Sequence, residues 1–125
     1  MKWGDGLDKM EPNGETLFHI QLLSRVIDMD RYPFVKLIIE KELSREECSE
    51  LMKLLVEINQ MYEVQKEEGL LDYTSLLIHF AGMLNEKLHP DITIASLKHE
   101  GYFVPLMDEF SRILERESKK QSRRK

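Results

Sequence analysis

The side chains best suited to chemistry lie in the first third of the sequence: His19, Asp30, Arg31 and Tyr32. An imidazole exchanges protons near neutral pH, and a carboxylate, a guanidinium and a phenol can orient a small ligand beside it. His19 and Asp30 are eleven residues apart, about 16 Å along an unbroken helix, so direct contact within one helix is excluded. The alternative function is therefore that of a small-molecule-binding protein or an enzyme, with a pocket between helices near His19.

Two of the potentially reactive side chains have a simpler structural explanation. His19 is flanked by Leu22, Leu23 and Val26 on the face of a predicted helix. A histidine in this position is more often a hydrogen-bonded core residue than a ligand, so we expect His19 to be buried. Cys48 also falls on an apolar helix face, where a thiol is typically a small core residue.

No motif for catalysis or cofactor binding is complete. Asp28-Met29-Asp30 is similar to the start of a calcium loop, but the required glycine and closing glutamate are missing. The sequence also lacks a phosphate loop, a dinucleotide fingerprint, a serine elbow and an HExxH motif. His89 and His99 have no partner at metal-ligand spacing, and His79 is two helical turns, about 10.5 Å, from Glu86, too far for direct contact. We therefore expect no catalytic residue, no metal and no cofactor.

The composition is typical of one soluble globular domain. Of the 125 residues, 42% are hydrophobic and 33% are charged, which is enough apolar surface for a single core. No apolar stretch is long enough to cross a membrane, and the first eight residues lack the apolar run of a signal peptide. Together with a single cysteine, these features predict a cytoplasmic protein.

The charge is unevenly distributed along the chain. Five of the 18 Lys and Arg residues lie in 119–125, so the remainder holds 13 of them against 23 Asp and Glu, a net charge of −10. An acidic body repels a phosphate backbone, so nucleic-acid binding by the folded domain is not expected. The basic tail is interpreted as a solvated terminal segment, and nucleic-acid binding through it is a minor alternative.

Hydrophobic periodicity predicts an all-α fold, a compact bundle or array of about six helices without strand alternation. The expected helices span residues 15–29, 33–42, 45–68, 73–88, 91–100 and 103–117. Ser44 and Glu47 have the spacing of a capping box, and Gly69 and Gly101 suit the left-handed position that ends a helix. The predicted organisation is a flexible arm over 1–13, one helical domain over 14–118 and a basic tail over 119–125.

The first predicted helix has the broadest apolar arc. Its hydrophobic residues spread over more than half of the helix circumference, while Gln21, Arg25 and Asp28 fill the polar remainder. A helix at the surface of a globular protein has a narrower apolar stripe. We therefore expect this helix to be largely buried, either within the fold or in a contact between subunits.

Three segments carry a resemblance to a known family: Ile20-Gln21-Leu22-Leu23, the stretch from Asp28 to Phe34 with the sequence DMDRYPF, and the stretch from Phe80 to Leu88 with the sequence FAGMLNEKL. Over about Leu17 to Leu114 the chain resembles the YhaI-like family of small uncharacterised proteins from Bacillus and related bacteria. The resemblance implies an all-helical cytoplasmic protein and implies no activity. No functional residue can be transferred from it, and the arm and the basic tail extend beyond the typical family pattern.

These observations favour a non-catalytic protein-interaction or regulatory module, with self-association as one form of that function. The broad apolar arc of the first helix and the apolar second helix, 33–42, exceed what a small bundle needs to bury. The expected partner is therefore a protein, either a second copy of the chain or another protein, rather than a membrane or a nucleic acid.

Overall fold

The computed structural model describes residues 14–123, and within this range the chain forms six α-helices, one short 3-10 turn and no β-strand. The helices are α1 (Gly14–Val26), α2 (Pro33–Glu40), α3 (Arg45–Glu67), α4 (Thr74–Met83), α5 (Pro90–Glu100) and α6 (Val104–Arg123), and the turn η1 (Met29–Arg31) lies between α1 and α2. The predicted all-α class is confirmed. The arm predicted for 1–13 lies outside the described residues.

Helix α3 begins and ends where the sequence predicted. Ser44 Oγ accepts a hydrogen bond from the Glu47 amide at 3.0 Å, and Glu47 Oε1 accepts one from the Ser44 amide at 2.9 Å, which completes the capping box. At the other end Gly69 adopts a φ of 85°, and the Leu70 amide donates to the carbonyl of Gln65 at 3.0 Å. This left-handed closure satisfies carbonyls that the end of the helix would leave unpaired.

Four helix ends differ from the prediction by two residues or more. Helix α1 ends at Val26 rather than at residue 29, and the 3-10 turn Met29–Arg31 follows it. Helix α2 ends at Glu40, and Glu42 follows in a left-handed turn with a φ of 53°. Helix α4 ends at Met83 because Leu84 is extended, with a ψ of 141°, so the chain turns before reaching residue 88. Helix α6 continues to Arg123, since the residues after 117 contain no proline or glycine that would end it.

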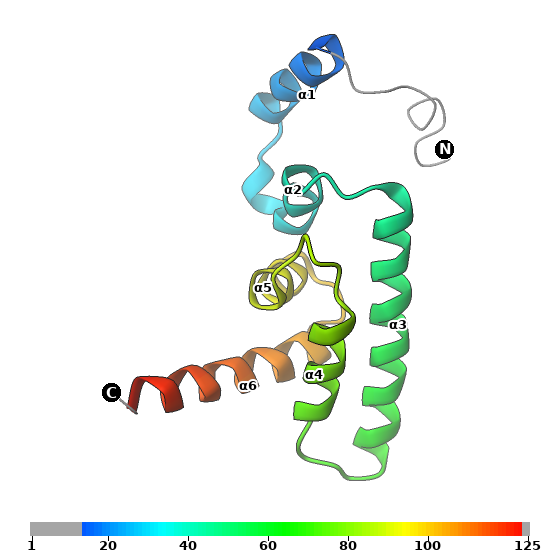
Figure 1. The fold of residues 1–125 in the computed structure, drawn as a ribbon, viewed down its shortest axis with the longest axis vertical. Helices are drawn as coiled ribbons and strands as arrows, with labels where there is room; N and C mark the ends of the chain where they lie inside the picture. The colour runs from blue at the N-terminus through cyan, green and yellow to red at the C-terminus, as the bar shows by residue number, and fades with distance from the viewer. Residues whose placement is uncertain (1–13, 124–125) are drawn as a thin grey trace.

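The core lies between α3, α4, α5 and α6 (Figure 1). Phe80 of α4 and Phe110 of α6 are fully buried, and their ring centroids are 5.8 Å apart. Other residues with an exposed fraction near zero surround this aromatic pair: Leu55, Ile58, Thr93, Ile94, Leu97, Leu106 and Met107. Interdigitated apolar side chains of this kind supply most of the free energy that stabilises a small helical domain.

Helix α2 is attached to the core through α5. Phe34 is buried, and its ring lies 5.5 Å from that of Tyr102, which follows α5. The Tyr32 side chain does not cap α2, and the Glu100 carboxylate accepts a hydrogen bond from the Val35 amide at 3.4 Å instead. A carboxylate at this position also interacts favourably with the positive end of the helix dipole.

Helix α1 is not buried within the chain, so that part of the prediction is wrong for a single copy. None of its residues is buried, and in Figure 1 it stands apart from the helices α2 to α6. Its apolar side chains spread around most of the helix, which is why the sequence pattern indicated burial without showing what would cover them. Burial of α1 in a contact between subunits stays a prediction.

Candidate functional site

The structure places His19 at the surface. Its side chain is 65% exposed on α1, and its Nε2 atom lies 4.0 Å from Oε2 of Glu15, one turn earlier. The interpretation of His19 as a core histidine is therefore wrong. An exposed imidazole beside one carboxylate has no enclosed volume in which to orient a substrate.

The other three predicted site residues lie together in the turn between α1 and α2. The Asp30 amide donates a hydrogen bond to the Asp28 carboxylate at 3.2 Å, and Lys36 Nζ lies 3.8 Å from Oδ1 of Asp30. Arg31 ends the 3-10 turn, and Tyr32 follows it with half of its surface exposed. These contacts shape the turn, and no contact found among residues 14–123 joins it to His19.

Two open cavities lie on the surface of the bundle. The smaller, about 240 Å³, is lined by residues of η1, α2 and α5, among them Asp30, Lys36 and Ile92. The larger, about 420 Å³, lies between the loop before α4 and the helix α6. Its lining combines three basic with three acidic residues, contains no histidine or cysteine, and includes Arg112, whose guanidinium is paired with Glu109 at 2.6 Å. His19 lines neither cavity.

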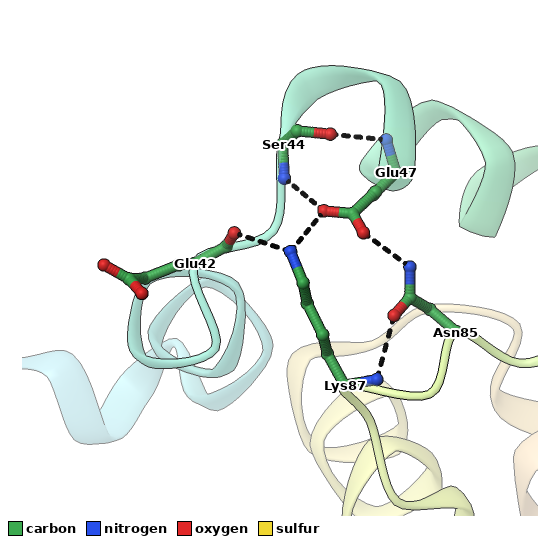
Figure 2. A network of polar contacts seen from close by, with 5 residues as sticks. All are labelled: Glu42, Ser44, Glu47, Asn85 and Lys87. Atoms are coloured by element: carbon green, nitrogen blue, oxygen red, sulfur yellow. Dashed lines mark hydrogen bonds and ion pairs between the residues drawn. The ribbon is translucent and has the colours of Figure 1, made fainter. Parts of the chain in front are cut away.

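A polar network joins three segments that are distant in sequence (Figure 2). Lys87, between α4 and α5, donates to Glu47 Oε1 at 2.8 Å and to the carbonyl of Glu42 at 3.3 Å. Asn85 donates to Glu47 Oε2 at 2.8 Å, while its own Oδ1 accepts from the Lys87 amide at 2.9 Å. Glu47 also caps α3 through Ser44, so its carboxylate connects the start of α3 to the loop between α4 and α5, and Lys87 of that loop binds the turn at Glu42.

This network is structural rather than catalytic. The hydrogen bond from Lys87, followed by those from the Ser44 amide and Asn85, lowers the pKa of Glu47 from 4.5 to about 2. A general base works best when its pKa is near the working pH, and its oxygens must be free to accept a proton. Both oxygens of Glu47 are already engaged as acceptors, so this carboxylate serves to hold the loops in place.

We expect Glu47→Gln to lower the melting temperature at neutral pH, because the ion pair with Lys87 is lost. The folded pKa of Glu47 is depressed, so its stabilising contribution is present above pH 4.5 and is lost as the pH falls towards 2. The difference in unfolding free energy between wild type and variant should therefore become smaller as the pH falls from 4.5 towards 2. Urea denaturation at several pH values measures this difference. Glu57→Gln, an exposed change on the same helix, is the matched control, and a difference that does not depend on pH would contradict the assignment.

Cys48 is half-buried near the start of α3. Burial, and to a smaller extent the neighbouring carboxylate of Glu47, raises the pKa of the Cys48 thiol. A reactive cysteine requires the opposite shift, because the thiolate is the nucleophile. The interpretation of Cys48 as a structural residue is consistent with this environment.

The most unusual surface of the described chain is the apolar surface of α1. Seven large hydrophobic side chains in this region are between 40% and 84% exposed: Leu17, Phe18, Ile20, Leu22, Leu23, Val26 and Ile27. We call this set the α1 surface. Single exposed hydrophobic residues are ordinary, but seven of them within eleven consecutive positions are unusual for the surface of a globular protein.

Helix α4 carries exposed residues that the sequence analysis missed. Ile78 is 66% exposed on the side of α4 away from the core, and Met83 is 64% exposed at the last residue of the helix. The available signal was the absence of any Asp, Glu, Lys or Arg in Thr74–Met83. Among the described helices none could cross a membrane, and residues 14–123 contain no cluster of side chains able to hold a metal ion.

Comparison with known families gives one match that extends over most of the sequence. A family model described as "Protein of unknown function (DUF1878)" matches residues 8–115. The match includes the whole region over which the sequence resembles a small uncharacterised family. It brings no catalytic or binding residue with it, so the function has to be inferred from the surface of the molecule itself.

Proposed function

Because the chain belongs to the DUF1878 family of proteins of unknown function, we propose a function from its own surface: a non-catalytic interaction module that self-associates through the α1 surface. The single observation that supports this proposal is a helix whose large hydrophobic side chains are all exposed. The narrower assignment to the YhaI-like proteins of Bacillus, and a cytoplasmic location, are part of the same proposal.

The first argument is the length of α1. It has 13 residues, and helices of about 12–15 residues or fewer are marginal in water unless tertiary contacts hold them. No residue of α1 is buried against its own bundle. A helix of this length therefore needs a partner that covers its apolar side chains, and the free energy of that burial stabilises both the helix and the complex.

The second argument is the area available. Seven large hydrophobic side chains, each between 40% and 84% exposed, lie within eleven consecutive residues, and a concentration of exposed apolar surface of this kind is typical of an interaction site. A stable interface buries roughly 800 Å² on each partner. A contact with two-fold symmetry uses the same surface twice, so two copies of the chain reach this size more readily than one copy bound to an unrelated small ligand.

The alternative function, a small-molecule-binding protein or enzyme near His19, receives less support. His19 is exposed, and neither of the two cavities described above includes it. Asp30 does line the smaller cavity, but the other polar residues in that lining, Lys36, Glu40 and Ser96, include no histidine or cysteine. The nucleic-acid alternative depends on the basic tail alone, and the acidic balance of the remaining chain opposes it.

Sedimentation velocity of the full chain tests the proposal. We expect the weight-average mass to rise from that of one chain towards a multiple of it as the protein concentration increases. A mass that stays at one chain at every concentration would contradict self-association.

A further inference from the structure

The larger cavity, about 420 Å³, has a side that the packed core holds in place. The loop before α4 contributes Leu71, Asp72 and Tyr73 to its lining, and α6 contributes Ile113 among others. Tyr73 and Ile113 are buried, and the ring centroids of Tyr73 and Tyr62 are 4.9 Å apart. The cavity is therefore formed before any ligand arrives, and its volume is within the range of small-ligand sites.

Three cations of α6 line this cavity. Arg112, Arg116 and Lys119 have the spacing i, i+4 and i+7, so they fall within about 60° of one another around the helix. The Arg112 guanidinium is already paired with Glu109 at 2.6 Å. Among residues 14–123, neither Arg116 nor Lys119 has a hydrogen bond or an ion pair, and both side chains are exposed. Their N–H donors are therefore free to engage a ligand.

The acidic residues of the lining are less available. Asp72 Oδ1 accepts hydrogen bonds from the Thr74 hydroxyl at 2.5 Å and from the Thr74 amide at 3.0 Å. These two bonds, and to a smaller extent the charge of Arg116, lower the pKa of Asp72. Glu109 is held by Arg112, which leaves Glu115 as the acidic residue of the lining with no hydrogen bond or ion pair in the described chain. The unused groups in the cavity are thus mainly donors, and they call for an anionic acceptor.

The charge of the surrounding sequence acts in the same direction. Residues 116–125 contain six Lys and Arg and one Glu, a net charge of +5, whereas the whole chain has a net charge of −5. An anion that approaches an acidic protein is attracted to its positive end, and the cavity lies where this basic stretch begins.

We propose that this cavity binds an organic anion, a carboxylate or a phosphate ester that carries an apolar group. The Arg116 guanidinium holds such a head group through two parallel hydrogen bonds, and Lys119 adds a second positive charge. Leu71 lines the cavity and is 92% exposed, so the apolar group of the ligand covers it. The Tyr73 hydroxyl already donates to the carbonyl of Leu70 at 2.6 Å and serves as a wall. This site is separate from the α1 surface and does not depend on self-association.

An NMR titration of the full isotope-labelled chain tests the site. The probes are phenyl phosphate and benzoate, together with inorganic phosphate, which lacks the apolar group, and benzylamine, which has the opposite charge. We expect saturable shifts of the Leu71 and Tyr73 amide signals with phenyl phosphate, with benzoate or with both, and binding weaker by at least about tenfold for the other two probes. The anion that binds more tightly identifies the head group.

A double variant links these shifts to the two cations. Arg116→Gln together with Lys119→Gln should weaken the binding of both aromatic anions by at least about tenfold, and because both side chains are exposed the bundle stays folded. The matched control, Lys41→Gln together with Lys53→Gln, removes two exposed positive charges outside the cavity and should bind as the wild type does.

Three results would overturn the proposal. The first is the absence of saturable shifts with either aromatic anion. The second is binding of inorganic phosphate or benzylamine as tight as that of the aromatic anions, since general attraction of ions would then be sufficient. The third is a double variant that binds these anions as the wild type does.

Discussion

Replacing Leu22 and Leu23 by glutamate is expected to abolish self-association while the bundle stays folded. Both side chains belong to the α1 surface and are exposed in the single chain, so the change creates no buried charge before association. On association the two carboxylates would enter an apolar contact without a partner, which is strongly unfavourable. The loss of a central apolar contact typically exceeds 2 kcal/mol, so the dissociation constant should rise by at least about 30-fold.

Light scattering coupled to size-exclusion chromatography measures this effect. The matched control is Val56→Glu together with Val64→Glu, two exposed apolar positions on α3 that lie outside the α1 surface. This control should associate as the wild type does. If the control is impaired as much as the α1 variant, added negative charge rather than the α1 surface would explain the loss, and the proposal would have to be abandoned.

Phe110→Ala is expected to destabilise the domain by about 3–5 kcal/mol, the range for removing a large aromatic side chain from a core. Phe110 is completely buried, and its ring packs against that of Phe80 with the centroids 5.8 Å apart. Phe110 belongs to a cluster of buried side chains that is close-packed, so the cavity left by the substitution should close only in part and most of the cost should remain.

Urea denaturation measures this loss as a change in the midpoint at constant slope. Leu71→Ala, at a position that is 92% exposed, is the control and should change the unfolding free energy by less than about 0.5 kcal/mol. A cost for Phe110→Ala below about 1 kcal/mol would show that the helices α4 and α6 do not share a packed core.

Local signals in the sequence were sufficient to place several features of the fold. The capping box at Ser44 and the left-handed glycines at 69 and 101 depend on neighbouring residues only, and the structure confirms all three. The end of α4 could not be predicted in this way. It depends on Asn85 and Lys87, whose hydrogen bonds to Glu47 bridge about forty residues of sequence and hold the chain out of helical geometry.

For the candidate site, too, the sequence predicted what depends on neighbouring residues and not what depends on tertiary contacts. Periodicity identified the apolar arc of α1, but the pattern is identical whether the arc faces the protein's own core or another molecule. His19 shared that arc and was therefore assigned to a core that α1 does not join.

The measurement that tests the central claim most directly is sedimentation velocity of the wild-type chain over a hundredfold range of concentration, with the Leu22→Glu, Leu23→Glu variant run in parallel. The account predicts that the wild type moves reversibly from one chain towards two as the concentration rises, while the variant stays at one chain throughout. A wild type that remains a single chain at the highest concentration, or a variant that associates as strongly as the wild type, would contradict it.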